Sequence, residues 1–253
     1  MGNAYTMYHM KSTPKLSKTS KMPAKSWSLP AWETCPGARS RQLDGTVTPS
    51  PACEGCYALT GAYQFPATIA SREHNLADWK NPDWVDAMVK GIGKGKLFRW
   101  FDSGDIYTME LAKKIIEVVQ RTPNCKHWLP TRSHKSIQGL VDFFNLYTKP
   151  MYEANDYHPV MENPNYLPNL VVRYSSDSVT GEKIKIAENT STIVQNAEDF
   201  VSEKGSVLCR AYTRGGKCGS CRACWSPAVK TVFYPKHGKK VSPKQFAKSL
   251  ITV

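Results

Sequence analysis

Residues 96–132 read KLFRWFDSGDIYTMELAKKIIEVVQRTPNCKHWLPTR, and this stretch decides the fold. Residues 96–101 are rich in apolar and aromatic side chains, which predicts a buried strand. Thr108 is a helix-capping residue type, and apolar side chains then recur at helical spacing to Gln120. Residues 126–129 predict a second strand. A strand, a helix and a strand in this order are typical of parallel strands joined by a crossover helix.

The same alternation continues on both sides of this unit. Strands are predicted over residues 26–32 and 169–174, with short strands in 183–207, and helices over 67–80, 83–90 and 133–147. The fold class that follows is α/β, with a parallel, partial (β/α) barrel-like sheet and a Cys-rich, metal-binding C-terminal extension. We therefore expect a basic flexible arm (1–25), an α/β core with an N-terminal Cys site (26–200), a Cys-rich metal module (201–237) and a basic tail (238–253).

Positive charge is concentrated at the two ends of the chain. The net charge is +13, yet residues 1–30 and 204–253 contain no Asp or Glu. Such ends predict a polyanionic partner, with nucleic acid first, because cations near phosphates release counterions. Trp225, Phe233 and Tyr234 either stack on bases or pack the metal module onto the core. With no apolar run of 18 residues and no secretory signal, the sequence predicts no membrane contact and a cytoplasmic location.

Eight cysteines fall into two groups and one single residue. Disulfides are disfavoured, because a chain of this size without a secretory signal does not need them. The C-terminal group has CxxCxxC spacing and predicts a metal site that holds either an iron–sulfur cluster or zinc. Three further cysteines predict an N-terminal metal site with one open position. The alternatives are one composite site shared with the C-terminal group and a CxxC hairpin without metal. Cys125 is expected to pack as a small hydrophobe. The C-terminal group is Cys209, Cys218, Cys221 and Cys224, and the N-terminal group is Cys35, Cys53 and Cys56.

Polar or metal-binding residues follow four successive predicted strands. Because the carboxyl ends of parallel strands meet at one edge of a sheet, we expect these residues to form one site. They are Cys35, Cys53 and Cys56 after the first strand, 102–105 after the second, Thr131 and Arg132 after the third, and 175–177 after the fourth. Structural roles, such as capping by Asp102 or ion pairs of Arg132 and Arg173, are the alternative.

Several motifs resemble those of the phage and plasmid gene 88 protein family. They are KMPAKSWSLPAWETCPG, ACEGCYAL, FRWFDSGDI, WLPTR and CGSCRACW, and the resemblance covers roughly residues 20–237. It implies a phage or mobile-element origin and carries no activity with it. For a phage-encoded chain, the cytoplasm concerned is that of the host cell.

A more distant resemblance is to radical S-adenosylmethionine enzymes. Those enzymes carry three Cys after the first strand of a partial barrel, and the Cys ligate a [4Fe-4S] cluster with one open iron. The resemblance implies such a cluster on Cys35, Cys53 and Cys56, with Tyr57 beside it. It also implies that Ser103, Gly104 and Asp105 hold the amino group of S-adenosylmethionine. Arg132, Arg173 and Asp177 become candidate cofactor or substrate contacts, and the C-terminal group becomes an auxiliary cluster site.

The spacing departs from that family, because 17 residues separate Cys35 from Cys53 where three are usual. Three hypotheses follow. The first is an iron–sulfur, radical S-adenosylmethionine-like enzyme that acts on nucleic acid or a nucleotide. The second is a non-catalytic nucleic-acid-binding protein stabilised by zinc or a cluster. The third is a phage factor that binds a host protein, with purely structural metals.

Overall fold

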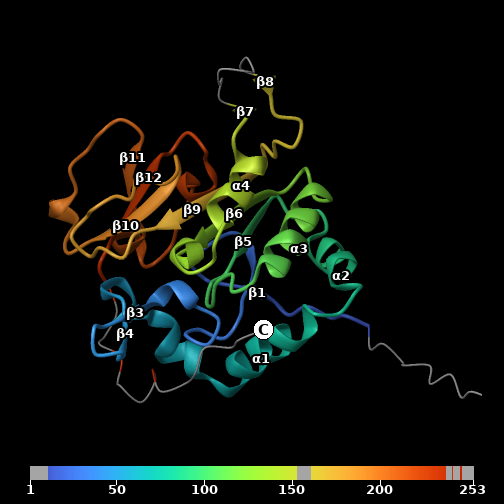
Figure 1. Ribbon diagram of the computed structural model, residues 1–253, viewed down its shortest axis with the longest axis horizontal. Coiled ribbons are helices and arrows are strands. Elements are labelled where there is room, and N and C mark those ends of the chain that lie inside the picture. The colour runs from blue at the N-terminus through green and yellow to red at the C-terminus, as the bar shows by residue number, and fades with distance from the viewer. Residues whose placement is uncertain (1–10, 153–160, 238–240, 242–245, 247–253) are drawn as a thin grey trace, which may run out of the picture.

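The computed structural model describes residues 11–152 and 161–237 together with Val241 and Phe246. Its centre is an eight-stranded sheet with the order β1-β2-β5-β6-β9-β10-β12-β11 (Figure 1). β1 is antiparallel to β2, and every other neighbouring pair is parallel. The strands are β1 (Leu16–Lys18), β2 (Lys25–Trp27), β5 (Leu97–Trp100), β6 (Lys126–Thr131), β9 (Leu170–Ser175), β10 (Thr190–Val194), β11 (Ser206–Leu208) and β12 (Thr231–Pro235).

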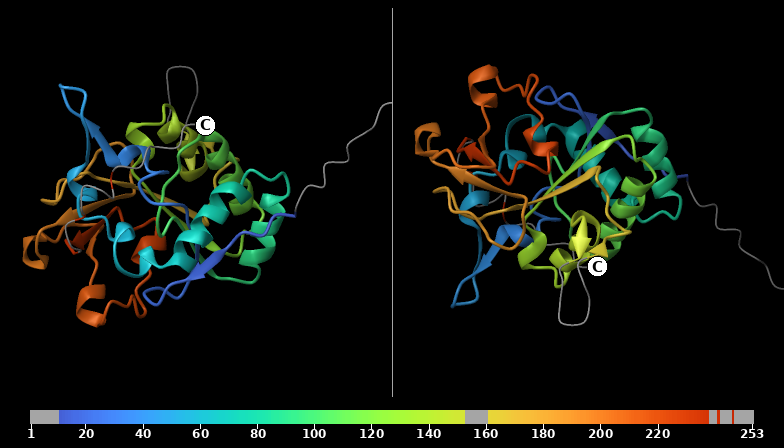
Figure 2. Two further views of the ribbon diagram at one scale, coloured as in Figure 1. Left: turned by 90° about the horizontal axis from the view of Figure 1, so that it is seen from below. Right: turned by 90° about the horizontal axis from the view of Figure 1, so that it is seen from above.

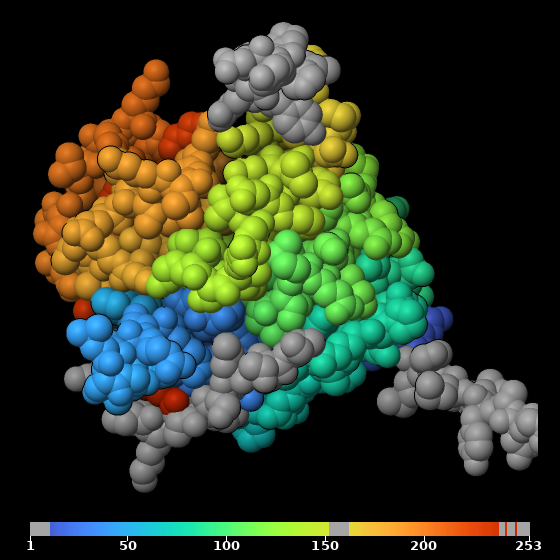
Figure 3. Space-filling view, in the orientation of Figure 1, coloured from blue at the N-terminus to red at the C-terminus, as the bar shows by residue number. Residues whose placement is uncertain are grey.

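Helices cover one face of this sheet. β2, β5, β6, β9 and β10 lie side by side in chain order, so right-handed crossovers all turn the same way and place the helices on the same face. Figure 3 shows α3 and α4 next to each other on that face. The helices are α1 (Pro66–Asp78), α2 (Trp84–Ile92), α3 (Met109–Gln120) and α4 (Leu140–Thr148). The expected mixed α/β fold with a mostly parallel sheet is therefore confirmed.

The alternation of side chains along the strands separates two packed layers. Phe98 and Trp100 of β5 point into the main core beneath the helices, where the Trp27 and Trp84 rings lie 5.2 Å apart. On the opposite face, Trp128 of β6 packs in a second cluster against Trp225. The Trp225 indole N–H donates to the Phe98 carbonyl at 2.8 Å. The Cys-rich segment thus covers the sheet face that the helices leave open.

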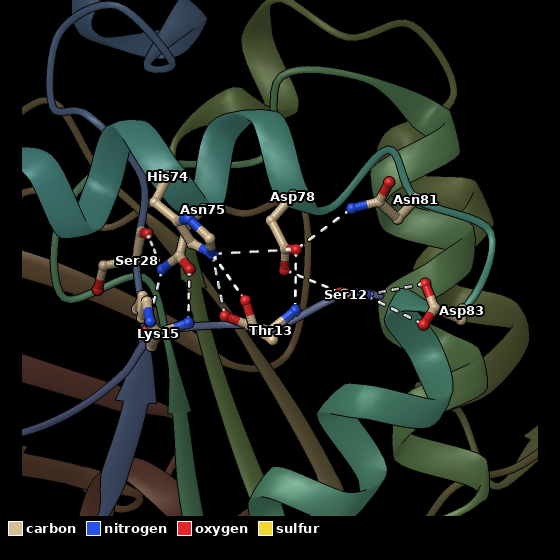
Figure 4. A network of polar contacts seen from close by, with 9 residues as sticks. All are labelled: Ser12, Thr13, Lys15, Ser28, His74, Asn75, Asp78, Asn81 and Asp83. Carbon is tan, nitrogen blue, oxygen red and sulfur yellow. Dashed lines mark hydrogen bonds and ion pairs between the residues drawn. The ribbon is translucent and has the colours of Figure 1, made fainter. Parts of the chain in front are cut away.

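Part of the segment expected to be an arm lies against α1 (Figure 4). The buried Asp78 carboxylate accepts hydrogen bonds from the Ser12 hydroxyl at 2.9 Å and from the Thr13 backbone N–H at 3.0 Å. Asn75 exchanges two hydrogen bonds with the backbone of Lys15. Residues 11–15 are thereby fixed to the helix, and β1 then joins the sheet. Residues 1–10 of the expected arm lie outside the described residues.

Two further features differ from the expected architecture. Within the described residues, β1 and β11 are the edges of the sheet and do not pair with each other, so the sheet is open and no barrel closes. The helix expected over 133–147 is split into a short 3-10 turn at Ser133–Lys135 and α4. Gly139 sits between them at φ +72°, a left-handed conformation that interrupts a right-handed helix.

Short elements complete the described chain. Two small antiparallel pairs project from it, β3 (Arg39–Arg41) with β4 (Val47–Pro49) and β7 (Met151–Tyr152) with β8 (Met161–Glu162). The remaining 3-10 turns are η1 (Pro36–Ala38), η2 (Pro51–Cys53), η3 (Tyr57–Leu59), η4 (Gly61–Gln64), η6 (Ala197–Asp199), η7 (Ala211–Arg214) and η8 (Ala223–Trp225). Residues 201–237 contribute β11 and β12 to the main sheet, and most of 238–253 lies outside the described residues.

Candidate functional site

A cavity of about 670 Å³ lies at the carboxyl ends of the parallel strands. Its walls come from the ends of β5, β6, β9 and β12, from β10, and from loops at both ends of the chain. Residues of both cysteine groups line this one cavity. The predicted site residues that line it are Cys35, Cys53, Cys56, Tyr57, Asp102, Ser103, Gly104, Asp105, Thr131, Arg132, Ser175, Cys209, Cys218 and Cys224.

The N-terminal thiols are Cys35, Cys53 and Cys56, held on consecutive tight turns. The Cys56 backbone N–H donates to the Cys53 carbonyl at 3.1 Å, so the CxxC segment folds back on itself. Burial raises the pKa of Cys56 to about 11. Burial also raises the pKa of Cys35, and negative charge on Asp105, Cys56 and Cys53 adds to that shift. The three thiols and one carboxylate are therefore close enough to repel one another when ionised.

Asp105 joins the ends of β5 and β6. Its Oδ1 accepts from the Ile106 backbone N–H at 2.7 Å, and its Oδ2 accepts from the Arg132 backbone N–H at 2.8 Å. Burial nevertheless raises the pKa of Asp105 to about 6, because desolvation outweighs these hydrogen bonds. Asp105 lines the cavity, and the Thr131 side chain also hydrogen-bonds to its carboxylate.

Gly104 and Ser103 shape the same turn. Gly104 has φ +75°, and a Cβ there would lie 2.6 Å from the Thr34 hydroxyl and 2.7 Å from the Leu29 Cβ. Only glycine permits this close approach. The Ser103 hydroxyl donates to the Leu29 carbonyl and also contacts the Arg72 guanidinium. Both residues therefore stabilise the turn as well as line the cavity.

A polar network ties the CxxC turn to β5, and it includes residues that the sequence analysis did not select. Arg99 donates to the Asp102 carboxylate at 2.8 Å and to the Tyr57 hydroxyl at 3.1 Å. Tyr63 donates to the other oxygen of Asp102 at 2.8 Å. Arg99 stands between Phe98 and Trp100 on a strand, and this alternation was the signal that it points away from the main core.

The C-terminal thiols that face the cavity are Cys209, Cys218 and Cys224. The Cys224 thiol lies 3.2 Å from the Tyr234 hydroxyl, a contact that the spacing of the cysteines did not reveal. Burial raises the pKa of Cys224 to about 11. Cys221 is exposed and does not line the cavity. None of the eight cysteines forms a disulfide, and the buried Cys125 packs in the main core, as expected.

Two predicted contacts are not part of the cavity. Arg173 is fully buried, and its guanidinium donates to the carbonyls of Ala223, Cys224 and Ser226 at 2.8–3.1 Å. It holds the Cys-rich segment and does not line the cavity. Asp177 forms ion pairs with Arg132 and Lys135 beside the cavity. Arg173 would have to leave the three carbonyls in order to contact a cofactor or substrate.

Among the residues that the structure describes, no three His, Cys, Asp or Glu side chains are arranged to hold a metal ion. Metal binding would therefore require the thiols to draw closer together. The donor chemistry suits such a step, since clustered thiols lose their protons to a bound metal. The cavity supplies the space, because both groups of thiols border it.

Comparison with known proteins identifies a family. The family model described as Gene product 88 matches residues 6–227, which is most of the chain. No curated protein and no solved structure matches. No helix in the described part of the chain is long and apolar enough to cross a membrane.

Proposed function

This chain belongs to the gene product 88 family, and we propose that it is an iron–sulfur enzyme of phage or mobile-element origin. In this proposal the enzyme is radical S-adenosylmethionine-like and acts on a nucleotide or on nucleic acid. One observation carries the proposal: thiols from both ends of the chain border a single cavity at the carboxyl edge of a parallel sheet. Ligand sites of α/β folds concentrate at this edge.

The N-terminal thiols are the proposed ligands of a [4Fe-4S] cluster. Three thiolates leave one iron open to a further ligand. Cys35, Cys53 and Cys56 lie on turns close enough for their charges to interact, which supports their use as one ligand set. When bound, such a cluster would supply the electron for cleavage of S-adenosylmethionine.

The strand ends provide partners for the amino acid part of S-adenosylmethionine. Asp105 presents a buried carboxyl group to the cavity, and a carboxylate is a strong acceptor for an ammonium group. A bound cation would favour its ionised form, which burial alone disfavours. Arg132, Ser103 and Tyr57 border the same space, and Arg132 offers a cation for a carboxylate.

The C-terminal thiols are proposed to hold a second cluster or a zinc ion. Cys209, Cys218 and Cys224 face the cavity from the side opposite the helices. Arg173 fixes the backbone that carries Cys224, so the position of this thiol does not depend on a metal alone. A substrate in the cavity would then lie between the two groups of thiols.

The test is iron, sulfide and zinc content of the anaerobically purified full chain. About eight irons and eight sulfides per chain are expected for two [4Fe-4S] clusters, and about four for one. C56A is expected to lose the N-terminal cluster and S-adenosylmethionine cleavage. C125A is the matched control, because Cys125 is buried away from the cavity. Zinc alone, even after anaerobic reconstitution with iron and sulfide, overturns the proposal.

Zinc alone would favour the second candidate, a non-catalytic nucleic-acid-binding protein. The supporting observation is an exposed, acid-free basic segment around the C-terminal thiols. In that case the thiols would stabilise the segment and the cavity would hold no cofactor. Oligonucleotide binding without cleavage of S-adenosylmethionine distinguishes this candidate from the enzyme.

A further inference from the structure

An exposed cluster of basic residues with one tyrosine lies beside the C-terminal thiols, and we call it the basic rim. It is carried by η7 and the loop that follows, the orange segment that projects from the body of the molecule in Figure 2. The basic rim consists of Arg210, Tyr212, Arg214, Lys217 and Arg222, all of them exposed. Arg210 and Lys217 are chain neighbours of Cys209 and Cys218, which line the cavity, so the rim borders the cavity.

The charge of the basic rim is not balanced by carboxylates. Residues 204–253 contain no Asp or Glu. Arg214 donates to the Cys218 carbonyl and Arg222 to the carbonyls of Gly219 and Cys221. Within the described ranges, none of the four cations forms an ion pair.

Several cations elsewhere on the surface have acidic partners. Lys183 pairs with Glu203, Lys230 with Glu188, and Arg121 with Asp86. The basic rim therefore differs from these positions in offering four neighbouring positive charges to an external anion.

Tyr212 adds an aromatic surface in the middle of this charge. It is 52% exposed, whereas Trp225 and Phe233, two aromatics considered for base stacking, are 3% and 6% exposed. Trp225 and Phe233 are therefore buried in the core, and the third candidate, Tyr234, is half-buried and lines the cavity. Tyr212 is exposed on the surface of this segment, where a base can reach its ring. Cations that follow a phosphate backbone, combined with an exposed ring, are the features of single-strand binding surfaces.

We propose that the basic rim binds single-stranded nucleic acid, with phosphates on its four cations and one base stacked on Tyr212. The cavity volume of about 670 Å³ is in the range of small-molecule sites, so it can admit one nucleotide and excludes a duplex. The proposal rests on the proposed function only in one step, the entry of a neighbouring base into the cavity.

The first test measures binding of a fluorescent oligo-dT to the full chain at several salt concentrations. R210Q/R214Q/K217Q/R222Q is expected to bind at least about tenfold more weakly. Its slope of log affinity against log salt should be shallower by about 3, since each lost phosphate contact removes about 0.7. R210Q/K217Q leaves the hydrogen bonds of Arg214 and Arg222 to the loop backbone in place, and it should give about half of this change in slope.

The matched control removes four exposed lysines far from the cavity, K90Q/K94Q/K113Q/K126Q. This control variant should keep most of the affinity for oligo-dT and the wild-type slope of log affinity against log salt. A rim variant with the wild-type slope, or a control with an equal loss, overturns the proposal.

The second test separates stacking from charge. Y212A is expected to weaken oligo-dT binding about fivefold or more, whereas Y212F should bind like the wild type. With an abasic oligonucleotide of the same length, Y212A should have no effect. An equal loss of affinity in Y212A for both oligonucleotides overturns the proposed stacking of a base on Tyr212. Metal content is measured on the same samples, so binding by iron-free protein would sustain the basic rim while the proposed enzyme fails.

Discussion

The Asp105 carboxylate accepts a hydrogen bond of 2.8 Å from the Arg132 backbone N–H, which fixes the ends of β5 and β6 to each other at the cavity. The two residues are 27 positions apart in sequence. They meet because β5 and β6 are parallel neighbours joined by α3. A buried acid at such a junction makes the stability of the sheet edge depend on pH.

The first prediction concerns this pH dependence. The folded-state pKa of Asp105 is raised to about 6 from 3.8, so the folded chain binds the proton more tightly than the unfolded chain. The stabilising contribution is present below pH 3.8 and is lost as the pH rises through 6. Relative to D105N, the unfolding free energy of the metal-free wild type should fall by about 2 kcal/mol between pH 4 and 7. Urea unfolding of both proteins at several pH values measures this, and a constant difference would contradict it.

His127 should act in the opposite direction. It is fully buried, and its Nε2 lies 2.8 Å from the Thr122 hydroxyl. Burial lowers the pKa of His127 to about 3, so the unfolded chain binds the proton more tightly. Relative to H127Q, wild-type stability should decrease by about 3 kcal/mol as the pH falls from 6.5 to 4. The difference in unfolding free energy between wild type and H237Q, a change at an exposed position, should stay nearly constant over this pH range. An equal change for both wild-type–variant pairs would refute this origin.

Gly104 should be irreplaceable for steric reasons. A Cβ at this position would lie 2.6–2.9 Å from atoms of Thr34 and Leu29. Gly45 provides a matched control, because its φ of +84° is similar and nothing lies within 4 Å of its Cβ position. G104A should therefore lose about 2 kcal/mol more unfolding free energy than G45A. Equal losses would mean that the turn can move to accept a Cβ without a loss of stability, and that packing does not require glycine at this position.

The sequence alone predicted that strands and helices alternate and that the carboxyl ends of the parallel strands lie together. The spacing of apolar residues and the type of the capping residue are local signals. Thr108 does cap α3, because its side chain accepts a hydrogen bond from the Leu111 backbone N–H. Parallel pairing then brings Asp105 and Arg132 together without further information. These parts of the fold follow from patterns within a few residues.

The remaining features depend on contacts that spacing does not encode. Arg173 is expected from the sequence to contact a cofactor or substrate. In the structure, the alternation of side chains along β9 turns it toward the Cys-rich segment instead. β12 lies in the sheet between β10 and β11, and no local sequence pattern predicts this strand order. Tyr212 was not selected because one tyrosine among glycines and arginines carries no periodic signal.

Arg173 should be essential for the Cys-rich segment. Its guanidinium satisfies carbonyls of 223, 224 and 226 in a buried environment. R173M would leave these acceptors unpaired and should cost about 3 kcal/mol of unfolding free energy. R121M is the control: Arg121 is exposed, so the loss of its surface ion pairs should change the unfolding free energy far less. Hydrogen exchange should rise in residues 223–226 of R173M, and unchanged protection there would contradict the anchoring role.

The two outer cysteines of CxxCxxC should not be equivalent to the middle one. Cys218 and Cys224 line the cavity, whereas Cys221 is exposed outside it. If the C-terminal metal faces the cavity, C224S should lose it, while C221S should keep most of it. Both variants keep the same chain length and a similar side-chain size, so metal content per chain compares them directly. Equal loss in both would show that Cys221 turns inward when metal binds, and the site would then use all the thiols of the CxxCxxC segment.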